Sequence, residues 1–298
     1  MNVLNINKCP LCGGSQFEQE ITCKDYYATG ESFKICRCKA CGFQFTQSAP
    51  VESEIGRYYE SPDYISHSNT HKGLMNRVYH YVRRYMLSRK AHLIKRTSRL
   101  NSGRLLDIGT GTGYFCHFMQ KKGWNVSAVE KSAQAREFAS AHFGLHIDAP
   151  EALEEYKESS FDVITLWHVM EHLEHLNETW DLLNRLLNNR GVLVIAVPNP
   201  NSFDAAKYKE MWAAYDVPRH LWHFTPSTIQ QFGAKHGFIL TERIPMPFDA
   251  FYVSMLSEKY QKNRFPFVKG LITGTRAGVA SLIKKEQSSS MIYVFRKK

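Results

Sequence analysis

The sequence predicts an α/β fold, in which a mostly parallel sheet carries helices on both faces and follows a small cysteine-rich unit. From about residue 100, short apolar runs alternate with amphipathic stretches, which is the pattern of a parallel sheet whose strands are joined by helices. A glycine-rich turn at 109–113 joins the first run to the first amphipathic stretch. Six of the seven cysteines lie within the first 41 residues, so a separate unit precedes the α/β domain.

The pattern predicts seven strands and four helices in the α/β domain. The expected strands are Arg104–Ile108, Asn125–Glu130, His146–Ile147, Val163–Trp167, Val192–Val197, Phe238–Arg243 and Met291–Phe295, and the expected helices are Gly113–Lys122, Ala133–Phe143, Glu178–Asn188 and Pro226–His236. A longer basic helix is expected at about Leu74–Arg99, with Leu74, Val78, Val82, Tyr85, Met86 and Leu93 at helical spacing. We therefore expect three parts: residues 1–48, a linker and basic helix at 49–100, and a domain at 101–298 with a helical insertion at about 245–290.

Composition and charge exclude several classes of protein. Apolar residues make up 43% of the 298 residues and charged residues 22%, which is ordinary for a globular protein. No apolar run approaches the ~18 residues that span a bilayer, and the N-terminus lacks the pattern of a signal peptide, so a cytoplasmic location is expected. The positive charges that give the net charge of +10 are not spread evenly along the chain. Residues 259–298, for example, hold ten Lys and Arg against a single acid, Glu286.

The N-terminal cysteines form two C-x-x-C-G pairs, Cys9-Pro-Leu-Cys12-Gly13 and Cys38-Lys-Ala-Cys41-Gly42. Each pair lets one tight turn offer two thiolates to the same ion, and four thiolates complete the tetrahedral shell of a structural zinc ion. The sequence therefore predicts a zinc ribbon with these four cysteines as ligands. Cys36 could take the place of Cys38, and Cys23 fits neither pair.

The glycine-rich turn is Asp107-Ile-Gly109-Thr-Gly111-Thr-Gly113-Tyr114. Glycines at the end of a strand permit positive φ and let a ligand approach bare backbone. A dinucleotide fingerprint would need glycine at position 114, and an acid at the strand end repels phosphate but suits a cofactor with a positive group. Glu130, at the end of the second strand, can accept hydrogen bonds from both hydroxyls of a ribose.

Together these motifs resemble the class I S-adenosylmethionine-dependent methyltransferases, with a Rossmann-like seven-stranded sheet. The resemblance covers about residues 100–245 and implies S-adenosylmethionine as cofactor. It places Asp107 near the methionine amino group, Glu130 on the ribose and Asp148 near the adenine. The other cofactor contacts that it implies are Gly109, Thr110, Gly111, Gly113, Tyr114, Trp167 and His168.

Histidines follow the fourth and fifth predicted strands. His168-Val-Met-Glu171-His172 matches a zinc-peptidase motif, but that motif needs a continuous helix, whereas here His168 follows a strand. The segment instead resembles the one after strand four in ubiquinone-pathway O-methyltransferases. Because an alcohol acceptor needs a proton acceptor near neutrality, we predict His220 as the general base, followed by His168 and His172, with packing roles as the alternative for each.

These observations favour a methyltransferase that acts on a small hydroxylated metabolite, a sugar or a lipid-linked intermediate, by O-methylation, with C-methylation of a keto sugar left open. The alternative is an RNA methyltransferase that binds RNA through the zinc ribbon and basic helix, although Leu166–Met170 lacks the Asn/Asp-Pro-Pro-aromatic motif of exocyclic-amine enzymes. A third alternative is a non-enzymatic protein that binds a partner through the zinc ribbon and whose methyltransferase domain has lost activity. The insertion is interpreted as a helical cap, or alternatively as a lid or a peripheral membrane element.

Overall fold

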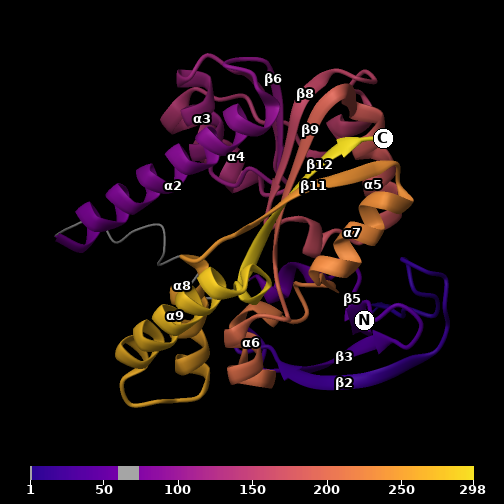
Figure 1. The fold of residues 1–298 in the computed structure, drawn as a ribbon, viewed down its shortest axis with the longest axis vertical. Helices are drawn as coiled ribbons and strands as arrows, with labels where there is room; N and C mark the ends of the chain where they lie inside the picture. Colours follow the sequence, from indigo (N-terminus) through magenta and orange to yellow (C-terminus); the bar gives the residue numbers. More distant parts are fainter. Residues whose placement is uncertain (1, 60–73) are drawn as a thin grey trace.

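The computed structural model describes residues 2–59 and 74–298, and side chains are described from residue 80 onwards in the second segment (Figure 1). Part of the predicted connection at 49–71 lies outside the described residues, as do the side chains of Leu74 and Val78 from the predicted apolar helix face. Among the described residues, no helix combines the length and the apolar character needed to cross a bilayer.

A six-stranded sheet forms the centre of the α/β domain, in the order β11-β12-β9-β8-β6-β7. Strands β7, β6, β8 and β9 are parallel, and β12 runs antiparallel to both β9 and β11. The bounds are β6 (Arg104–Ile108), β7 (Asn125–Val129), β8 (Phe161–Trp167), β9 (Leu187–Pro198), β11 (Phe238–Pro245) and β12 (Ser290–Lys297). The predicted α/β class with a mostly parallel sheet is therefore confirmed.

The described sheet has one strand fewer than the seven expected. The segment predicted as a strand at His146–Ile147 pairs with the sheet only through a bridge between Val129 and Asp148. The helix before it ends at Phe143 and Pro150 begins a 3₁₀ helix, η2 (Pro150–Glu154). Too few residues remain between these elements to extend a ladder, and proline has no N–H to donate to one.

Helices cover both faces of the sheet (Figure 1). On one face α2 (Leu74–Ser98) and α3 (Tyr114–Lys121) bury Ile94 and Phe115 against Leu105 and Val163. On the other face α5 (Leu176–Leu186) and α7 (Pro226–Lys235) bury Trp180 and Phe232. Helix α4 (Ala133–Phe143) follows β7.

The first half of α2 does not bury the face predicted for it. Val82 and Tyr85 are each 45% exposed, whereas Leu93 is 8% exposed. In Figure 1 the N-terminal half of α2 projects past the end of the sheet, so only its C-terminal half has a surface to pack against. The expectation of one continuous apolar face was wrong for this half.

The N-terminal unit shares a sheet and a core with the α/β domain. Strands β2 (Phe17–Lys24), β3 (Ser32–Cys38) and β4 (Gln44–Gln47) are antiparallel, and β10 (Trp222–His223) adds a fourth strand from the loop before α7. Phe43 and Phe45 are fully buried in the main hydrophobic core. A short pair, β1 (Val3–Leu4) with β5 (Ala49–Pro50), completes the unit. The unit therefore packs as part of one structure.

A buried arginine ties the two parts together. The Arg219 guanidinium, whose side chain is 4% exposed, pairs with Asp25 of the N-terminal unit at 3.1 Å and with Asp216 at 2.6 Å. It also donates to the backbone carbonyl of Tyr58 at 2.6 Å. Burial works against the charged form, yet these carboxylates raise the pKa of Arg219 above its usual range.

Replacing Arg219 by alanine is expected to lower the free energy of unfolding by about 3–5 kcal/mol, because it leaves buried carboxylates without their partner. Urea denaturation would measure the change. Arg243→Ala is the matched control, since its ion pair with Glu286 is partly exposed and such pairs contribute little. An equal loss in both variants would contradict a special role for the buried arginine.

Two further helices follow β11 and form a hairpin, α8 (Asp249–Tyr260) and α9 (Pro266–Ile283). The buried Glu258 of α8 accepts hydrogen bonds from Tyr208 at 2.8 Å and from Lys207 at 3.3 Å. Both partners belong to α6 (Phe203–Tyr208), so polar contacts attach the hairpin to the domain in addition to the chain connection.

Candidate active site

The glycine-rich turn leaves β6 with three glycines at positive φ, namely 69° at Gly109, 58° at Gly111 and 78° at Gly113. A Cβ on Gly109 would lie 2.4 Å from Cγ2 of Val169, and one on Gly113 would lie 2.9 Å from Cδ1 of Leu145. A Cβ on Gly111 would meet nothing within 4 Å. The outer glycines therefore permit close packing, and the middle one presents open backbone where a ligand can lie.

Asp107 ends β6 beneath this turn and is 1% exposed. Its carboxylate accepts a hydrogen bond from the Thr165 hydroxyl at 2.6 Å, and the Cys116 thiol lies 3.6 Å away. Burial raises the pKa of Asp107, and the Thr165 hydrogen bond opposes that shift. Thr165 was not predicted as a site residue, although a hydroxyl amid the apolar residues of β8 was the available signal.

Glu130 is fixed against the same turn. One carboxylate oxygen accepts from the Gly111 amide at 2.7 Å and the other from the Ser132 amide at 2.9 Å. Each oxygen keeps a second lone pair, so the carboxylate can still accept from a ribose.

The remaining predicted cofactor contacts lie at different places around the turn. Asp148 accepts from the Tyr156 hydroxyl at 2.9 Å, and the Thr110 hydroxyl lies 3.0 Å from the Cys116 sulfur. Tyr114 packs edge-on against Phe143. The indole N–H of Trp167 is buried and, among the described residues, has no acceptor.

This arrangement fits S-adenosylmethionine. The open backbone at Gly111 lets the cofactor approach closely. The fixed carboxylate of Glu130 can accept hydrogen bonds from ribose hydroxyls, and the buried carboxylate of Asp107 offers a negative charge to the amino group. The orphaned indole N–H of Trp167 is a further donor at the same end of the sheet.

His168 follows β8 in a left-handed conformation, with φ 57°. Its Nε2 lies 3.1 Å from Oδ2 of Asp249 and its Nδ1 lies 3.4 Å from Oε1 of Glu171. Burial works against protonation, yet the contacts with Asp249 and Glu171 raise the pKa of His168 to about 10. The ring is therefore a cation at neutral pH and a poor proton acceptor. Asp249 was not predicted, because it belongs to the insertion.

The raised pKa of His168 makes a prediction for NMR. In a pH titration its imidazole is expected to titrate near pH 10 rather than near the usual ~6.5. Its contribution to stability is complete below about pH 6.5 and is lost as pH rises through about 10, because the folded state binds the proton more tightly. Asp249→Asn is expected to lower this pKa. Glu242→Gln, which removes a carboxylate paired with Arg96, should leave it unchanged; wild-type titration near 6.5 would contradict the assignment.

Glu171, His172 and His220 converge beside His168. One ligand atom from each of the three lies within 4.8 Å of the others, and the two imidazole rings are 4.6 Å apart. Nδ1 of His172 donates to the Arg219 carbonyl and Nδ1 of His220 donates to the Ala214 carbonyl, both at 2.9 Å. Because a carbonyl only accepts, Nε2 of each ring is left to bind a proton or a metal ion.

The Glu171 carboxylate is buried, and its one side-chain ion pair among the described residues is the long contact with His168. Its side chain is 1% exposed, and neither oxygen accepts a well-formed hydrogen bond from the described residues. Burial opposes its charge, but His168 and the two neighbouring histidines lower its pKa overall. A buried carboxylate without a well-formed hydrogen bond is costly, so Glu171 has acceptor capacity that a ligand could use.

His220 and His223 are held neutral. Burial, and then the neighbouring His172, lower the pKa of His220 to about 4. Burial lowers the pKa of His223 to about 3, and its Nε2 lies 3.0 Å from the Thr46 hydroxyl of β4. His223 therefore joins the N-terminal unit to the domain, and His220 is available as a neutral ring beside Glu171.

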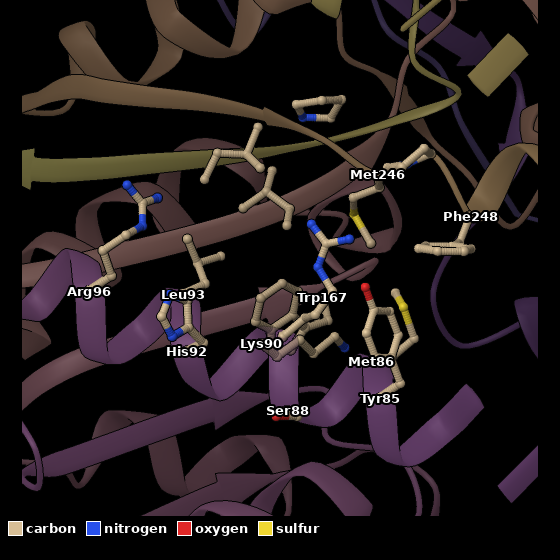
Figure 2. A pocket seen from close by; sticks show the side chains of 15 residues that line it. Tyr85, Met86, Ser88, Lys90, His92, Leu93, Arg96, Trp167, Met246 and Phe248 are labelled. Carbon is tan, nitrogen blue, oxygen red and sulfur yellow. The ribbon is translucent and has the colours of Figure 1, made fainter. Parts of the chain in front are cut away.

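A cavity of about 390 Å³ lies between α2 and the end of β11, within the range of small-molecule pockets. Figure 2 shows Tyr85 and Met86 of α2 on one side and Met246 and Phe248 on another, with Trp167 and Lys90 between them. Nζ of Lys90 lies 4.2 Å from the centroid of the Trp167 ring, and burial lowers the pKa of Lys90. The cavity is thus mainly apolar, and three basic residues line it: Arg89, Arg96 and Lys90, which lies beside Trp167.

The four predicted zinc ligands come together at the N-terminus. The sulfurs of Cys9, Cys12, Cys38 and Cys41 all lie within 4.8 Å of one another, with pairs at 3.5 and 3.6 Å. Zinc–sulfur bonds of about 2.3 Å in a tetrahedron place sulfurs roughly 3.8 Å apart, so the four thiols could hold zinc. Both turns close alike, with the Gly13 amide on the Cys9 carbonyl and the Gly42 amide on the Cys38 carbonyl, each at 2.8 Å.

The other two cysteines of this unit have different surroundings. Cys23 is 1% exposed and packs with Phe33, Ile35 and Tyr58, and Cys36 is half-buried on β3. Neither belongs to the group of four, and Cys23 is a residue of the core.

A family model described as "Methyltransferase domain" matches residues 80–243, more than half of the chain. The chain belongs to this methyltransferase family. The matched span contains the glycine-rich turn, Glu130 and the Glu171–His172–His220 cluster, so the family assignment covers the candidate site and the predicted resemblance is confirmed.

Among the relatives of this methyltransferase, a ubiquinone biosynthesis O-methyltransferase from Maricaulis maris (strain MCS10) is 33% identical over 131 residues, which are 40% of this chain and 52% of that protein. A namesake from Rhodopseudomonas palustris (strain HaA2) is 26% identical and covers 52% of this chain and 66% of its own length. The chain therefore spans about half to two thirds of these relatives. The solved geranyl diphosphate C-methyltransferase from Streptomyces coelicolor A3(2) shares the fold, with a TM-score of 0.53 at 13% identity over 77% of this chain and 87% of that one.

Proposed function

We propose that the protein is an S-adenosylmethionine-dependent O-methyltransferase of a small hydroxylated acceptor. The observation that carries the acceptor chemistry is the buried Glu171 carboxylate, which lies beside the rings of His172 and His220. The Nδ1 atoms of both rings donate to backbone carbonyls, and Nε2 of His220 lies 3.9 Å from Oδ2 of Asp216. Val169, two residues before Glu171, packs against Gly109 of the glycine-rich turn. The cluster is thus attached to the turn that would hold the cofactor.

In this proposal one group of residues holds the cofactor and another group activates the acceptor. S-adenosylmethionine, when bound, supplies an electrophilic methyl group. Asp107, the 109–113 backbone and Glu130 would hold and orient it, and orientation is the main requirement of in-line methyl transfer. The cation His168, kept in place by Asp249 and Glu171, is a positioning residue in this proposal rather than the base.

His220 is the proposed proton acceptor. Its ring is neutral at neutral pH, its Nδ1–H is fixed on the Ala214 carbonyl, and its Nε2 can accept the hydroxyl proton. The imidazolium that forms would be stabilised by Glu171 nearby. The same three residues also fit a divalent cation, since a carboxylate and two imidazoles are common ligands, and such an ion, when bound, would acidify a hydroxyl.

The cavity of Figure 2 is the proposed site for the apolar part of the acceptor. Its residues Tyr85, Met246 and Phe248 offer contact with carbon atoms, and Trp167, the last residue of β8, also lines it. The N-terminal unit is proposed to hold a structural zinc ion through its four clustered cysteines, because four thiolates leave no open position for catalysis. The RNA alternative has no observation in its favour.

Calorimetry with S-adenosylmethionine tests the cofactor assignment. Wild-type protein is expected to bind it, and Asp107→Asn is expected to bind it at least about tenfold more weakly, because the variant removes the charge for the amino group. Asp181→Asn, an exposed carboxylate of α5 (72%), is the matched control. Absence of binding to the wild type would overturn the proposed function.

A labelled-methyl screen then tests the acceptor class. Hydroxylated small molecules with an apolar part are expected to be labelled, and total RNA is not. Label in RNA but in no small molecule would overturn the acceptor assignment while leaving the cofactor assignment intact.

A further inference from the structure

Helix α9 packs on α8 through a narrow face of small residues. A Cβ on Gly270 would lie 2.6 Å from the Met255 Cα, and one on Gly274 would lie 2.6 Å from Cδ1 of Phe251. Ala277 and Ser281 continue this face and are each 1% exposed. The glycines are therefore used inside the hairpin, where they let the two helices approach closely, and the large side chains of α9 are left on its other faces.

Those large side chains are apolar and exposed. Leu282 is 80% exposed and Ile283 is 84% exposed. Four more residues at helical spacing are about half exposed: Val268, Leu271, Ile272 and Val279. At 100° per residue these six positions lie on the side of α9 opposite Gly270 and Gly274, so the helix presents a continuous apolar stripe to the surroundings.

The stripe has a uniformly positive border. Residues 259–285 contain seven Lys and Arg and no Asp or Glu. Lys269 and Arg276 lie beside the stripe and are exposed, and Lys284 and Lys285 follow its end. An apolar stripe with basic residues along one side and beyond its end is complementary to a bilayer surface that carries anionic headgroups. A second copy of the chain would instead bring the same positive charges together, which opposes self-association.

We propose that α9 is a membrane-docking helix, which lies in the plane of an anionic bilayer surface with Leu271, Leu282 and Ile283 in the apolar zone. The contact does not depend on the proposed methyltransferase activity. One consequence of the membrane contact does depend on that activity. Helix α8 begins directly after Phe248, which lines the cavity. If the activity is as proposed, docking favours an amphiphilic acceptor that resides in the membrane.

Vesicle co-sedimentation of the full chain tests the contact. Binding is expected to vesicles of phosphatidylcholine mixed with phosphatidylglycerol, to be much weaker with phosphatidylcholine alone, and to fall with added salt. The double variant Leu282→Gln/Ile283→Gln is expected to lower the partition coefficient at least about tenfold, because two large apolar side chains no longer enter the bilayer. Arg276→Gln/Lys284→Gln is expected to lower it about tenfold through the loss of two charges.

Ile239→Gln is the matched control, since Ile239 is also half exposed but lies on β11; its vesicle binding should equal that of the wild type. Circular dichroism of each variant would confirm that the fold is kept. No binding, binding without preference for anionic lipid, or equal loss in the Ile239 variant would overturn the proposal. Sedimentation velocity showing a dimer that the Leu282/Ile283 variant dissociates would also overturn it. Calorimetry with S-adenosylmethionine reports on the proposed function separately from all of these outcomes.

Discussion

Replacing Glu171 by glutamine is expected to lower kcat by about two to four orders of magnitude, the range found for groups that act in proton transfer. The change keeps the shape of the side chain and removes the charge that would stabilise a protonated His220. It also removes the only carboxylate among the three converging ligand atoms. Methyl transfer to the acceptor found in the screen would be measured under saturating cofactor.

Two measurements separate this effect from damage to the fold. The affinity for S-adenosylmethionine is expected to stay within about twofold of wild type, because Glu171 is not among the residues that line the turn. Glu178→Gln, an exposed glutamate of α5, is the matched control and should keep full activity. If the Glu171 variant turned over normally, the reacting hydroxyl would have to lie away from this cluster, and the proposed role of Glu171 in proton transfer would be wrong.

The residues that sequence reasoning could place are those whose role depends on local pattern. The apolar runs predicted β6 and β8, and the closely spaced glycines predicted the turn between β6 and α3. The observed bounds of α4 agree with the predicted helix residue for residue. The predicted start of a helix at Pro226 likewise agrees with α7, where Thr225 caps the helix and Pro226 occupies its first turn. In each case the energetics are settled within a few neighbouring residues.

The parts that could not be predicted depend on long-range packing. Asp249 contacts His168 across 81 positions of sequence, and no local pattern signals that an insertion residue will reach the end of β8. Trp222 and His223 read as loop residues, yet they pair with β4 because the N-terminal sheet offers an unpaired edge. The same packing decides which histidine is cationic: both ring nitrogens of His168 contact carboxylates, whereas for His220 and His223 the burial of the ring outweighs the more distant carboxylates.

Removing the proposed zinc ion is expected to destabilise the whole protein and not the N-terminal unit alone. A strong chelator, or Cys38→Ser, would remove a ligand set whose zinc binding is worth about 10–16 kcal/mol in small zinc domains. Phe43 lies between Cys41 and β4, Phe45 lies within β4, and both are fully buried in the main core. Loosening the turn at Cys38 and Cys41 therefore exposes core surface of the α/β domain. We expect a lower Tm and a single transition, measured by calorimetry beside metal analysis.

Cys36→Ser is the control that makes this prediction specific, because Cys36 lies two residues from Cys38 on the same strand but outside the group of four. It should retain zinc and stability. The loss should also reach the active site, since β4 pairs with β10 and the Thr46 hydroxyl donates to the carbonyl of His220 at 2.7 Å. Activity is therefore expected to fall together with zinc content. A chelated protein with unchanged Tm and full activity would show that the four cysteines are not a structural metal centre.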